Sequence, residues 1–251
     1  YISDEPFDSQ APIRAQMKAL CAMIQEVDPK IPIYSSTWRH VPEWDGSITL
    51  WGFGHYGIVP TEVMARRRAA GDRIWFTTDG QMCLDTPLCA VERLLPHYCF
   101  KYDVQAYEFW GVSWTTYDPF RFGWHRFIHQ SDQPGKSYYV RYPNGDGYLL
   151  YPGPLAGRPG PVSSVRLEQA REGVEDFEYL VLLKTLIAKA KAAGKDTAKA
   201  EQAMAEADAL VTIPNAGGRY SSKILVNPES LYAARESLAK AIETISREVL
   251  K

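Results

Sequence analysis

The sequence has no marked excess of either charge and no long apolar run. Its 251 residues contain 28 Lys and Arg against 30 Asp and Glu, which gives a net charge of -2. Nucleic-acid and anionic-membrane binders usually carry a basic surplus, so this balance argues against both partners. No stretch of about eighteen apolar residues is present, which excludes a membrane span in this chain. The chain opens on Tyr1 rather than Met, without a signal peptide, and we expect the natural protein to begin upstream.

Cysteine is scarce and irregularly spaced. The four thiols, none in a Cys-x-x-Cys motif, are Cys21, Cys83, Cys89 and Cys99. Mostly apolar neighbours favour buried structural thiols over disulfides or a zinc site. Aromatic residues, in contrast, make up 12% of the chain and concentrate between Tyr34 and Tyr151. Rings in such numbers form a core, or provide the flat surfaces on which sugars stack.

The first seven residues, Tyr1 to Phe7, place two adjacent carboxylates after an apolar start. Asp4 and Glu5 follow Tyr1 and Ile2, and Pro6 stops the segment from continuing as a strand or helix. Adjacent acids repel each other, which is tolerated in open water or where one acid must stay protonated for chemistry. The pair is therefore either a solvated turn or the two acids of an enzyme that cleaves glycosidic bonds.

Strand and helix patterns alternate over the first half of the chain. Strands are predicted at residues 31–36, 48–52, 73–78 and 104–110, besides the opening segment, and helices at 12–27, 61–70 and 87–102. The first helix should bury Ile13, Met17, Leu20, Ile24 and Val27, and the third Val91, Leu94, Leu95 and Tyr98. This alternation predicts repeated βα units and a parallel sheet.

Polar and aromatic residues gather just beyond the carboxyl ends of these strands. They are Asp4, Glu5, Trp38, His40, His55, Tyr56, Asp79, Trp110 and Trp114. In an eight-stranded βα barrel, active sites are built on that side. Five strands cannot close such a barrel. We therefore expect residues 1–118 to form the C-terminal portion of a (β/α)8 TIM barrel, from about strand 4 to strand 8.

The remaining sequence divides into a loop-rich region and a helical region. Residues 119–162 carry turn signals, and we predict a β-hairpin that pairs residues 137–142 with 147–151. Residues 163–251 read as helices that pack on the barrel. The first should bury Leu167, Ala170, Val174, Phe177 and Val181, and the last, capped by Asn227, should bury Leu231, Leu238, Ile242, Ile245 and Val249.

Three separated segments resemble glycoside hydrolase family 123. They are Ser3-Asp4-Glu5-Pro6, the stretch from Gly145 to Gly153 (GDGYLLYPG), and the stretch from Gly160 to Glu168 (GPVSSVRLE) that continues to Gly173–Tyr179 (GVEDFEY). Arg93-Leu94-Leu95 and Trp110 look like the last barrel helix and strand of that family. The resemblance extends over nearly the whole chain but only over the C-terminal part of the family's catalytic region.

The resemblance implies a β-N-acetylgalactosaminidase that retains the anomeric configuration. The sugar's own acetamido oxygen would attack the anomeric carbon, Asp4 would orient and stabilise that amide, and Glu5 would act as general acid and then base. Glu5 would need a raised pKa, whereas Asp4 would stay ionised. The resemblance implies neither metal nor cofactor. It also implies a carbohydrate substrate, an N-terminal barrel half and a β-sandwich domain outside this chain, and an extracytoplasmic or secreted location.

The rest of the sugar pocket is predicted from position alone. Trp38, Trp110 and Trp114 are either core residues or stacking platforms, and His55 follows a strand end. Tyr56 and Tyr117 are candidates to bind the acetamido oxygen. The chain departs from the family pattern at Thr77, Thr78 and Asp79, where an aromatic residue and a cysteine are expected, and at Glu108, where an apolar or basic residue is commoner.

Two other functions fit parts of the sequence. The departures at Thr77 and Glu108 would suit a glycan-binding relative that is non-catalytic or differently specific. His125 and His129, four residues apart, could share a helix face as ligands of a metal hydrolase, although the sequence offers no obvious third ligand. The charged residues between Arg166 and Asp176 have helical spacings that suit structural ion pairs.

Overall fold

A computed structural model describes residues 1–37, 39–53, 61–77, 90–113, 118–122, 127–130, 137–140, 145, 147–213 and 227–249. The chain divides into two compact units. The first comprises Tyr1–Asp79, Lys101–Phe109 and Ile213–Ser222, and the second comprises Gly80–Phe100, Trp110–Thr212 and Lys223–Lys251. Among the described helices, none combines the length and the apolar character needed to cross a membrane.

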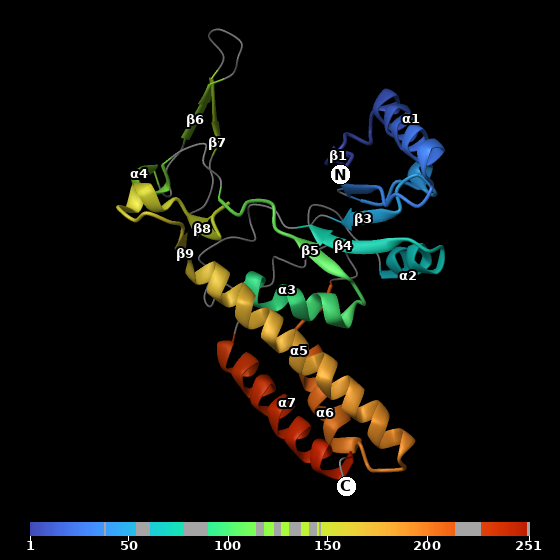
Figure 1. Cartoon of the computed structure of the whole chain (residues 1–251), viewed down its shortest axis with the longest axis vertical. Helices are drawn as coiled ribbons and strands as arrows, with labels where there is room; N and C mark the ends of the chain where they lie inside the picture. Colours follow the sequence, from blue (N-terminus) through green and yellow to red (C-terminus); the bar gives the residue numbers. More distant parts are fainter. Residues whose placement is uncertain are drawn as a thin grey trace. The chain divides into compact units, whose positions relative to one another are not determined.

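A parallel five-stranded sheet organises the first unit (Figure 1). Its strands are β1 (Ser3–Asp4), β2 (Tyr34–Thr37), β3 (Leu50–Phe53), β4 (Arg73–Thr77) and β5 (Ala106–Glu108), and they neighbour one another in chain order. Every neighbouring pair is parallel. The predicted parallel sheet is therefore confirmed, and this mixed α/β fold is compatible with part of a βα barrel.

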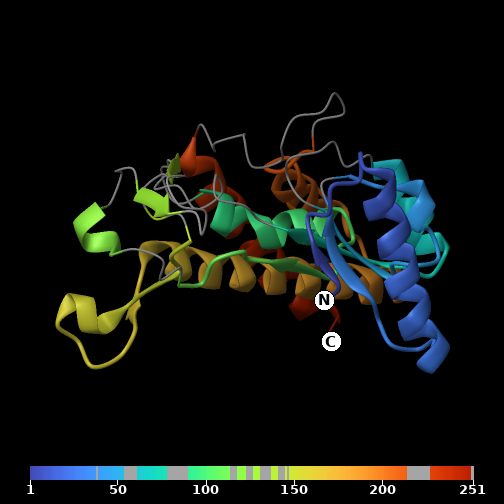
Figure 2. The ribbon, with the colours of Figure 1, turned by 90° about the horizontal axis from the view of Figure 1, so that it is seen from above.

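One face of the sheet is apolar and lies on the helix side. The helical segments of this unit are α1 (Ala11–Val27), η1 (Pro42–Trp44) and α2 (Thr61–Ala69), and Figure 2 shows α1 alongside the first strands. Since side chains alternate along a strand, Trp51 and Phe53 of β3 share a face with Ile74 and Phe76 of β4. All four are fully buried.

The buried stripe of α1 is narrower than the sequence pattern predicted. Met17 and Cys21 are buried, whereas Leu20 and Val27 are exposed. The prediction for those two residues was therefore wrong. A helix lying on one side of a sheet covers it with a single line of residues, and Met17 and Cys21, four apart, supply that line. Cys21 and Cys99 are buried free thiols, as predicted, while Cys83 and Cys89 lie outside the described residues.

The second unit is mainly helical. Its elements are α3 (Ala90–Lys101, of which Lys101 falls in the first unit), α4 (Pro119–Phe122), β6 (Phe127–Gln130), β7 (Ser137–Val140), β8 (Leu150–Tyr151), η4 (Gly153–Ala156), β9 (Val162–Ser163), α5 (Val165–Ala192), α6 (Ala198–Asp208) and α7 (Pro228–Val249). Asn227 caps α7 through its side-chain oxygen, which accepts from the Glu229 amide at 3.1 Å. The predicted cap is confirmed.

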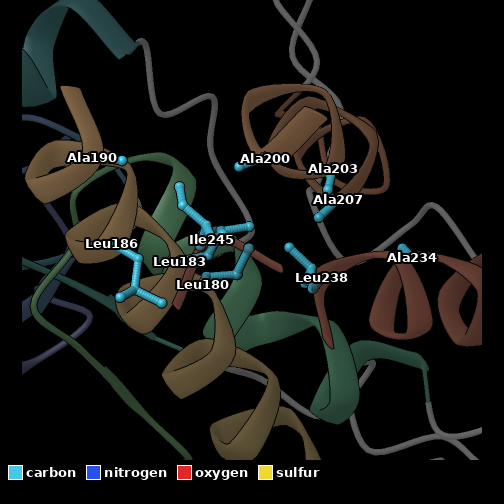
Figure 3. Packing of buried hydrophobic residues seen from close by; sticks show 10 residues of the cluster. All are labelled: Leu180, Leu183, Leu186, Ala190, Ala200, Ala203, Ala207, Ala234, Leu238 and Ile245. Carbon is cyan, nitrogen blue, oxygen red and sulfur yellow. The ribbon is translucent and has the colours of Figure 1, made fainter. Parts of the chain in front are cut away.

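Helices α5, α6 and α7 pack against one another around small and branched apolar side chains. Figure 3 shows Leu180 and Leu183 of α5 pointing toward Leu238 and Ile245 of α7, with the alanines of α6 completing the cluster. Leu231, Leu238 and Ile245 are buried and Ile242 and Val249 are partly buried, so the predicted apolar face of α7 is confirmed. Alanines on α6 let the helices approach closely.

The predicted hairpin of residues 137–142 with 147–151 is wrong. Strand β7 instead pairs antiparallel with β6, and β8 pairs antiparallel with β9. The turn signals at residues 132–135 fall between β6 and β7 in the sequence, and Tyr148 pairs with Ser113. Both sets of turn signals were visible in the sequence, but the partner of each strand depends on contacts that turn signals do not encode.

The predicted buried face of α5 is also partly wrong. Val174 and Val181 are exposed, while the helix buries Arg166 and Asp176. Asp176 accepts a hydrogen bond from Arg93 of α3 at 2.8 Å, and Arg235 of α7 lies 3.3 Å from its second oxygen. The side of α5 that faces inward therefore carries Asp176, whose buried charge is paired with arginines of α3 and α7. The predicted structural role of these charges is confirmed for Asp176.

Candidate active site

Asp4 and Glu5 lie at the carboxyl end of β1. Asp4 is in register with Ser36 of β2, and the Glu5 amide donates to the Ser36 carbonyl oxygen at 3.1 Å. The backbone of Glu5 then enters the left-handed region, with φ 40°. Only a few per cent of non-glycine residues adopt such a conformation, and they gather at functional sites. The turn ends β1 directly after Asp4 and leaves Glu5 partly buried.

The Asp4 carboxylate is held by two hydroxyl groups. Its Oδ1 atom accepts from the Tyr1 hydroxyl at 2.8 Å and from Ser36 Oγ at 3.0 Å, and these two hydroxyls lie 3.0 Å apart. Asp4 itself is exposed, whereas Ser36 is buried. Asp4 is thus fixed in direction and still open to a ligand.

The sheet face that carries Asp4 is polar. Residues in register with it or two positions away along the strands include Tyr34, Ser36, Gly52, Trp75, Thr77 and Glu108. This face contrasts with the apolar helix side of the same strands. Hydroxyl and carboxyl groups on one surface, with aromatic rings between them, suit a ligand that combines hydroxyls with flat apolar patches, as a sugar does.

Tyr34 crosses this face and reaches Glu108. Its hydroxyl donates to Glu108 Oε2, three strands away. A Cβ atom at Gly52 would lie 2.5 Å from the Tyr34 hydroxyl and 2.8 Å from the Thr77 methyl group, so glycine on β3 makes the crossing possible. Sequence reasoning marked Glu108 only as a departure and missed Tyr34. The sequence did contain a signal, because Gly52 is a small residue on a strand that lies between those of Tyr34 and Glu108.

Burial raises the pKa of the Tyr34 phenol, and its hydrogen bond to Glu108 raises it further. The phenol therefore keeps its proton, and Glu108 accepts. The Tyr34 ring centroid lies 5.2 Å from that of Trp75 and 5.2 Å from that of Tyr1. Three aromatic rings thus follow one another across the polar face, within the distance range of favourable ring contacts.

A polar hollow of about 360 Å³ lies beside the segments that follow β1 and β2. It is lined by Asp8, Ser9, Arg14, Arg39, His40, Val41, Pro42 and Glu43. Its cations are engaged: Arg39 Nε donates to Asp8 Oδ2 at 2.5 Å, and Arg14 pairs with Glu43 at 3.2 Å. The hollow therefore offers hydrogen-bonding groups with little unbalanced charge.

Most of the predicted pocket aromatics fall where the structure gives no description. Trp38, His55, Tyr56, Trp114 and Tyr117 lie outside the described residues. Trp110 is described, is partly buried and belongs to the second unit. The structure thus brings Asp4 together with Tyr1, Ser36 and the face of Tyr34, and the role of every predicted site residue stays a prediction.

The metal hypothesis gains no support from the described residues. His125 lies outside them, and His129 lies in β6, where the backbone alone is described. Among the residues the structure covers, no group of three His, Cys, Asp or Glu side chains could hold a metal ion.

Comparisons with known proteins identify a family. The sequence model described as "Glycoside hydrolase 123, catalytic domain" matches residues 1–183. A search of curated proteins finds no match. Among solved structures, a family 123 glycoside hydrolase from Clostridium perfringens, described in a study of glycolipid glycan hydrolysis, superposes with a TM-score of 0.53 at 15% identity. The match covers 98% of this chain and 40% of that chain, so this chain spans less than half of the neighbour's length.

Proposed function

This chain belongs to glycoside hydrolase family 123, and on that premise we propose that it removes terminal N-acetylhexosamine, specifically β-N-acetylgalactosamine, from glycans with retention of configuration. The observation that carries the proposal is the arrangement of Asp4 and Glu5. One carboxylate is aimed by two hydroxyls on a polar sheet face, and the next residue is turned by a left-handed backbone. Adjacent acids held in different environments suit different roles.

The proposed mechanism uses the sugar's own acetamido group. Its carbonyl oxygen attacks the anomeric carbon while the bond to the leaving oxygen breaks, which gives a cyclic oxazolinium ion. Asp4, ionised and held by Tyr1 and Ser36, accepts a hydrogen bond from the amide N–H and balances the positive charge. Glu5 donates its proton to the leaving oxygen. Glu5 then takes a proton from water while the water oxygen bonds to the anomeric carbon. The bond from that carbon to the acetamido oxygen breaks, which restores the acetamido group and gives overall retention.

The same premise extends the interpretation of the fold. We propose that β1 to β5 are strands 4 to 8 of an eight-stranded βα barrel, with residues 1–118 as barrel, 119–162 as a connecting region and 163–251 as helices that pack on it. Asp4 and Glu5 at a strand's carboxyl end match the side where such barrels place their chemistry. The first three strands, and a β-sandwich domain, would come from upstream chain, and the protein would act outside the cytoplasm.

A panel of chromogenic sugars tests the activity. The protein at its full natural length is assayed with the nitrophenyl β-glycosides of N-acetylgalactosamine, N-acetylglucosamine and galactose. We expect hydrolysis of the first, slower hydrolysis of the second and none of the third, because galactose lacks the acetamido nucleophile. Activity confined to the plain galactoside would rule out the mechanism.

A second function has a specific observation in its favour. Glu108 departs from the family pattern, and its engagement by Tyr34 shows that this difference is built into the polar face. A glycan-binding relative without turnover would bind N-acetylgalactosamine in calorimetry and hydrolyse none of the three glycosides. Hydrolysis of any of them excludes this alternative.

A further inference from the structure

Glu108 lies on the same polar face as Asp4, the first residue of the proposed catalytic pair. It is in register with Thr77 of β4, which neighbours the Gly52 site on β3, and the chain of neighbours continues through Ser36 to Asp4. Glu108 is partly buried at the last residue of β5. A carboxylate at a strand's carboxyl end is at the edge where this fold class binds its ligands.

The hydrogen bond from Tyr34 fixes only one oxygen of Glu108. The phenol donates to Oε2, and a carboxylate has about four acceptor sites on its two oxygens. Because burial and the contact with Glu108 raise the pKa of Tyr34, the phenol keeps its proton and acts as the donor in this hydrogen bond. The carboxylate is thus oriented and retains acceptor capacity for the hydroxyls of a sugar.

The charge around this face is negative. Asp4, Glu5 and Glu108 are acidic. Among the described strand residues, Arg73 shares this face by register with Leu50 and Tyr34, but it lies at the amino end of β4, whereas Thr77 and Glu108 lie at the carboxyl ends of their strands. The nearby Arg39 is already paired with Asp8. Among the described residues at the carboxyl ends of β1 to β5, no Lys or Arg without an acidic partner is placed to receive a substrate anion.

We propose that Glu108 is a specificity-determining residue that selects uncharged amino sugars and rejects sugars bearing a sulfate or carboxylate group. This inference rests on the proposed function, since it concerns the same site. Glu108 would accept hydrogen bonds from ring hydroxyls of the neutral sugar. An O-sulfate in their place would bring two anions together without a cation between them, and such like-charge contact opposes binding.

The experiment compares three substrates, one neutral and two sulfated, across matched variants. Nitrophenyl β-N-acetylgalactosaminide and its 6-O-sulfate and 4-O-sulfate are assayed with the full-length protein. For the wild type we expect kcat/KM to favour the neutral sugar by about 100-fold over at least one sulfate, as for like charges in contact at an effective dielectric constant of ~20. Glu108→Gln keeps the shape and removes the charge, and should reduce that preference about tenfold or more.

Two further variants separate charge from structure. Glu62→Gln removes an exposed carboxylate from α2 and should leave the preference unchanged. Tyr34→Phe keeps the ring against Trp75 and frees Glu108, so it should weaken the preference less than Glu108→Gln does, in the same direction. A wild-type preference that persists undiminished in Glu108→Gln would overturn the inference.

Binding of the free sugars separates this inference from the proposed function. Calorimetry with N-acetylgalactosamine and its sulfates gives the corresponding ratio of dissociation constants, which does not depend on turnover. If no glycoside is hydrolysed but neutral sugar is bound selectively through Glu108, the proposed hydrolysis fails and the inference holds. If glycosides are hydrolysed with equal efficiency whether sulfated or not, the function holds and the inference fails.

Discussion

The polar face of the sheet and the helical cluster of α5 to α7 both contain buried polar groups, but they use them differently. On α5, Asp176 is 1% exposed and both of its neighbours in the ion network are arginines that it anchors. On the sheet, Asp4 is exposed although two hydroxyls hold it. In the first arrangement, the charges are paired with one another inside the packed helices. The second leaves an oriented carboxylate available.

This difference distinguishes polar groups that stabilise the fold from polar groups that are available to a ligand. A buried ion pair removes both partners from solvent and is lost at a high free-energy cost when one partner is deleted. A carboxylate held by neutral hydroxyls keeps its charge without a cation to cancel it, so it can stabilise a positive charge on a ligand. We therefore expect substitutions on the sheet face to change activity most and substitutions in the helical cluster to change stability most.

The largest expected effect is on turnover. Glu5→Gln should lower kcat on nitrophenyl β-N-acetylgalactosaminide by about 10²- to 10⁴-fold, because the amide cannot deliver or take a proton. Binding of N-acetylgalactosamine, measured by calorimetry, should persist. Glu62→Gln on α2 is the matched control and should retain wild-type kcat. An unchanged kcat in Glu5→Gln would contradict the role of Glu5 as the general acid.

In the helical cluster, Asp176→Ala should reduce the free energy of unfolding by about 3–5 kcal/mol, because it leaves Arg93 buried without its main partner. Urea denaturation measures the loss. The double variant Asp176→Leu with Arg93→Met removes both charges and should recover most of it. If the double variant is less stable than Asp176→Ala, desolvation of an unpaired charge is not the cause. The kcat of folded Asp176→Ala should match the wild type.

A steric change on the sheet face should affect both quantities. Gly52→Ala places a methyl group 2.5 Å from the Tyr34 hydroxyl, so the ring must move and release Glu108. Overpacking of this kind costs about 1–3 kcal/mol, visible as a lower Tm, and the preference for neutral sugar should fall with it. Gly160→Ala is the control, since its added methyl meets nothing within 4 Å. Equal effects of the two variants would contradict the crossing of Tyr34 over β3.

The last effect concerns pH and appears only below neutral pH. Burial, reinforced by the charge of Arg93, lowers the pKa of His97 to about 4, and neither ring nitrogen has a hydrogen-bond partner among the described residues. The unfolded chain binds this proton near pH 6.5 and the folded chain near 4. Stability should therefore fall as pH drops through that window, by at most about 1.4 kcal/mol per pH unit.

His97→Leu removes this titration. Between pH 6.5 and 4, the variant's free energy of unfolding should decline less steeply than that of the wild type, as measured by urea denaturation at several pH values. Identical slopes would show that His97 is equally protonated in both states.

Local sequence patterns predicted many of the helices and strands, whereas the partners that these elements contact were harder to predict. The parallel sheet, the apolar face of α7 and the Asn227 cap follow from periodicity and end signals over a few residues. The partner of β7 could not be predicted in this way, because strand pairing joins segments that local signals do not connect. The buried side of α5 could not be predicted either. Arg166 and Asp176 look like surface residues until their partners Tyr148 and Arg93 are known.

The candidate site shows the same limit. Asp4 and Glu5 were predicted because two adjacent acids at a strand end are unusual in themselves. The Tyr34 to Glu108 contact spans 74 positions of sequence and depends on the register of four strands. Only the register shows that Gly52 clears a path between them. The sequence contains the tyrosine of β2, the glycine of β3 and the acid of β5, but their relation is visible only once the sheet is known.

The most direct test compares the N-acetyl and N-trifluoroacetyl forms of nitrophenyl β-galactosaminide on the wild-type protein. Fluorine withdraws electrons from the amide oxygen and makes it a poorer nucleophile. If that oxygen attacks the anomeric carbon, with Asp4 holding the amide and Glu5 transferring the proton, kcat must fall steeply for the fluorinated sugar. An equal kcat for the two sugars would show that the amide takes no part in bond breaking and would contradict the roles assigned to both acids.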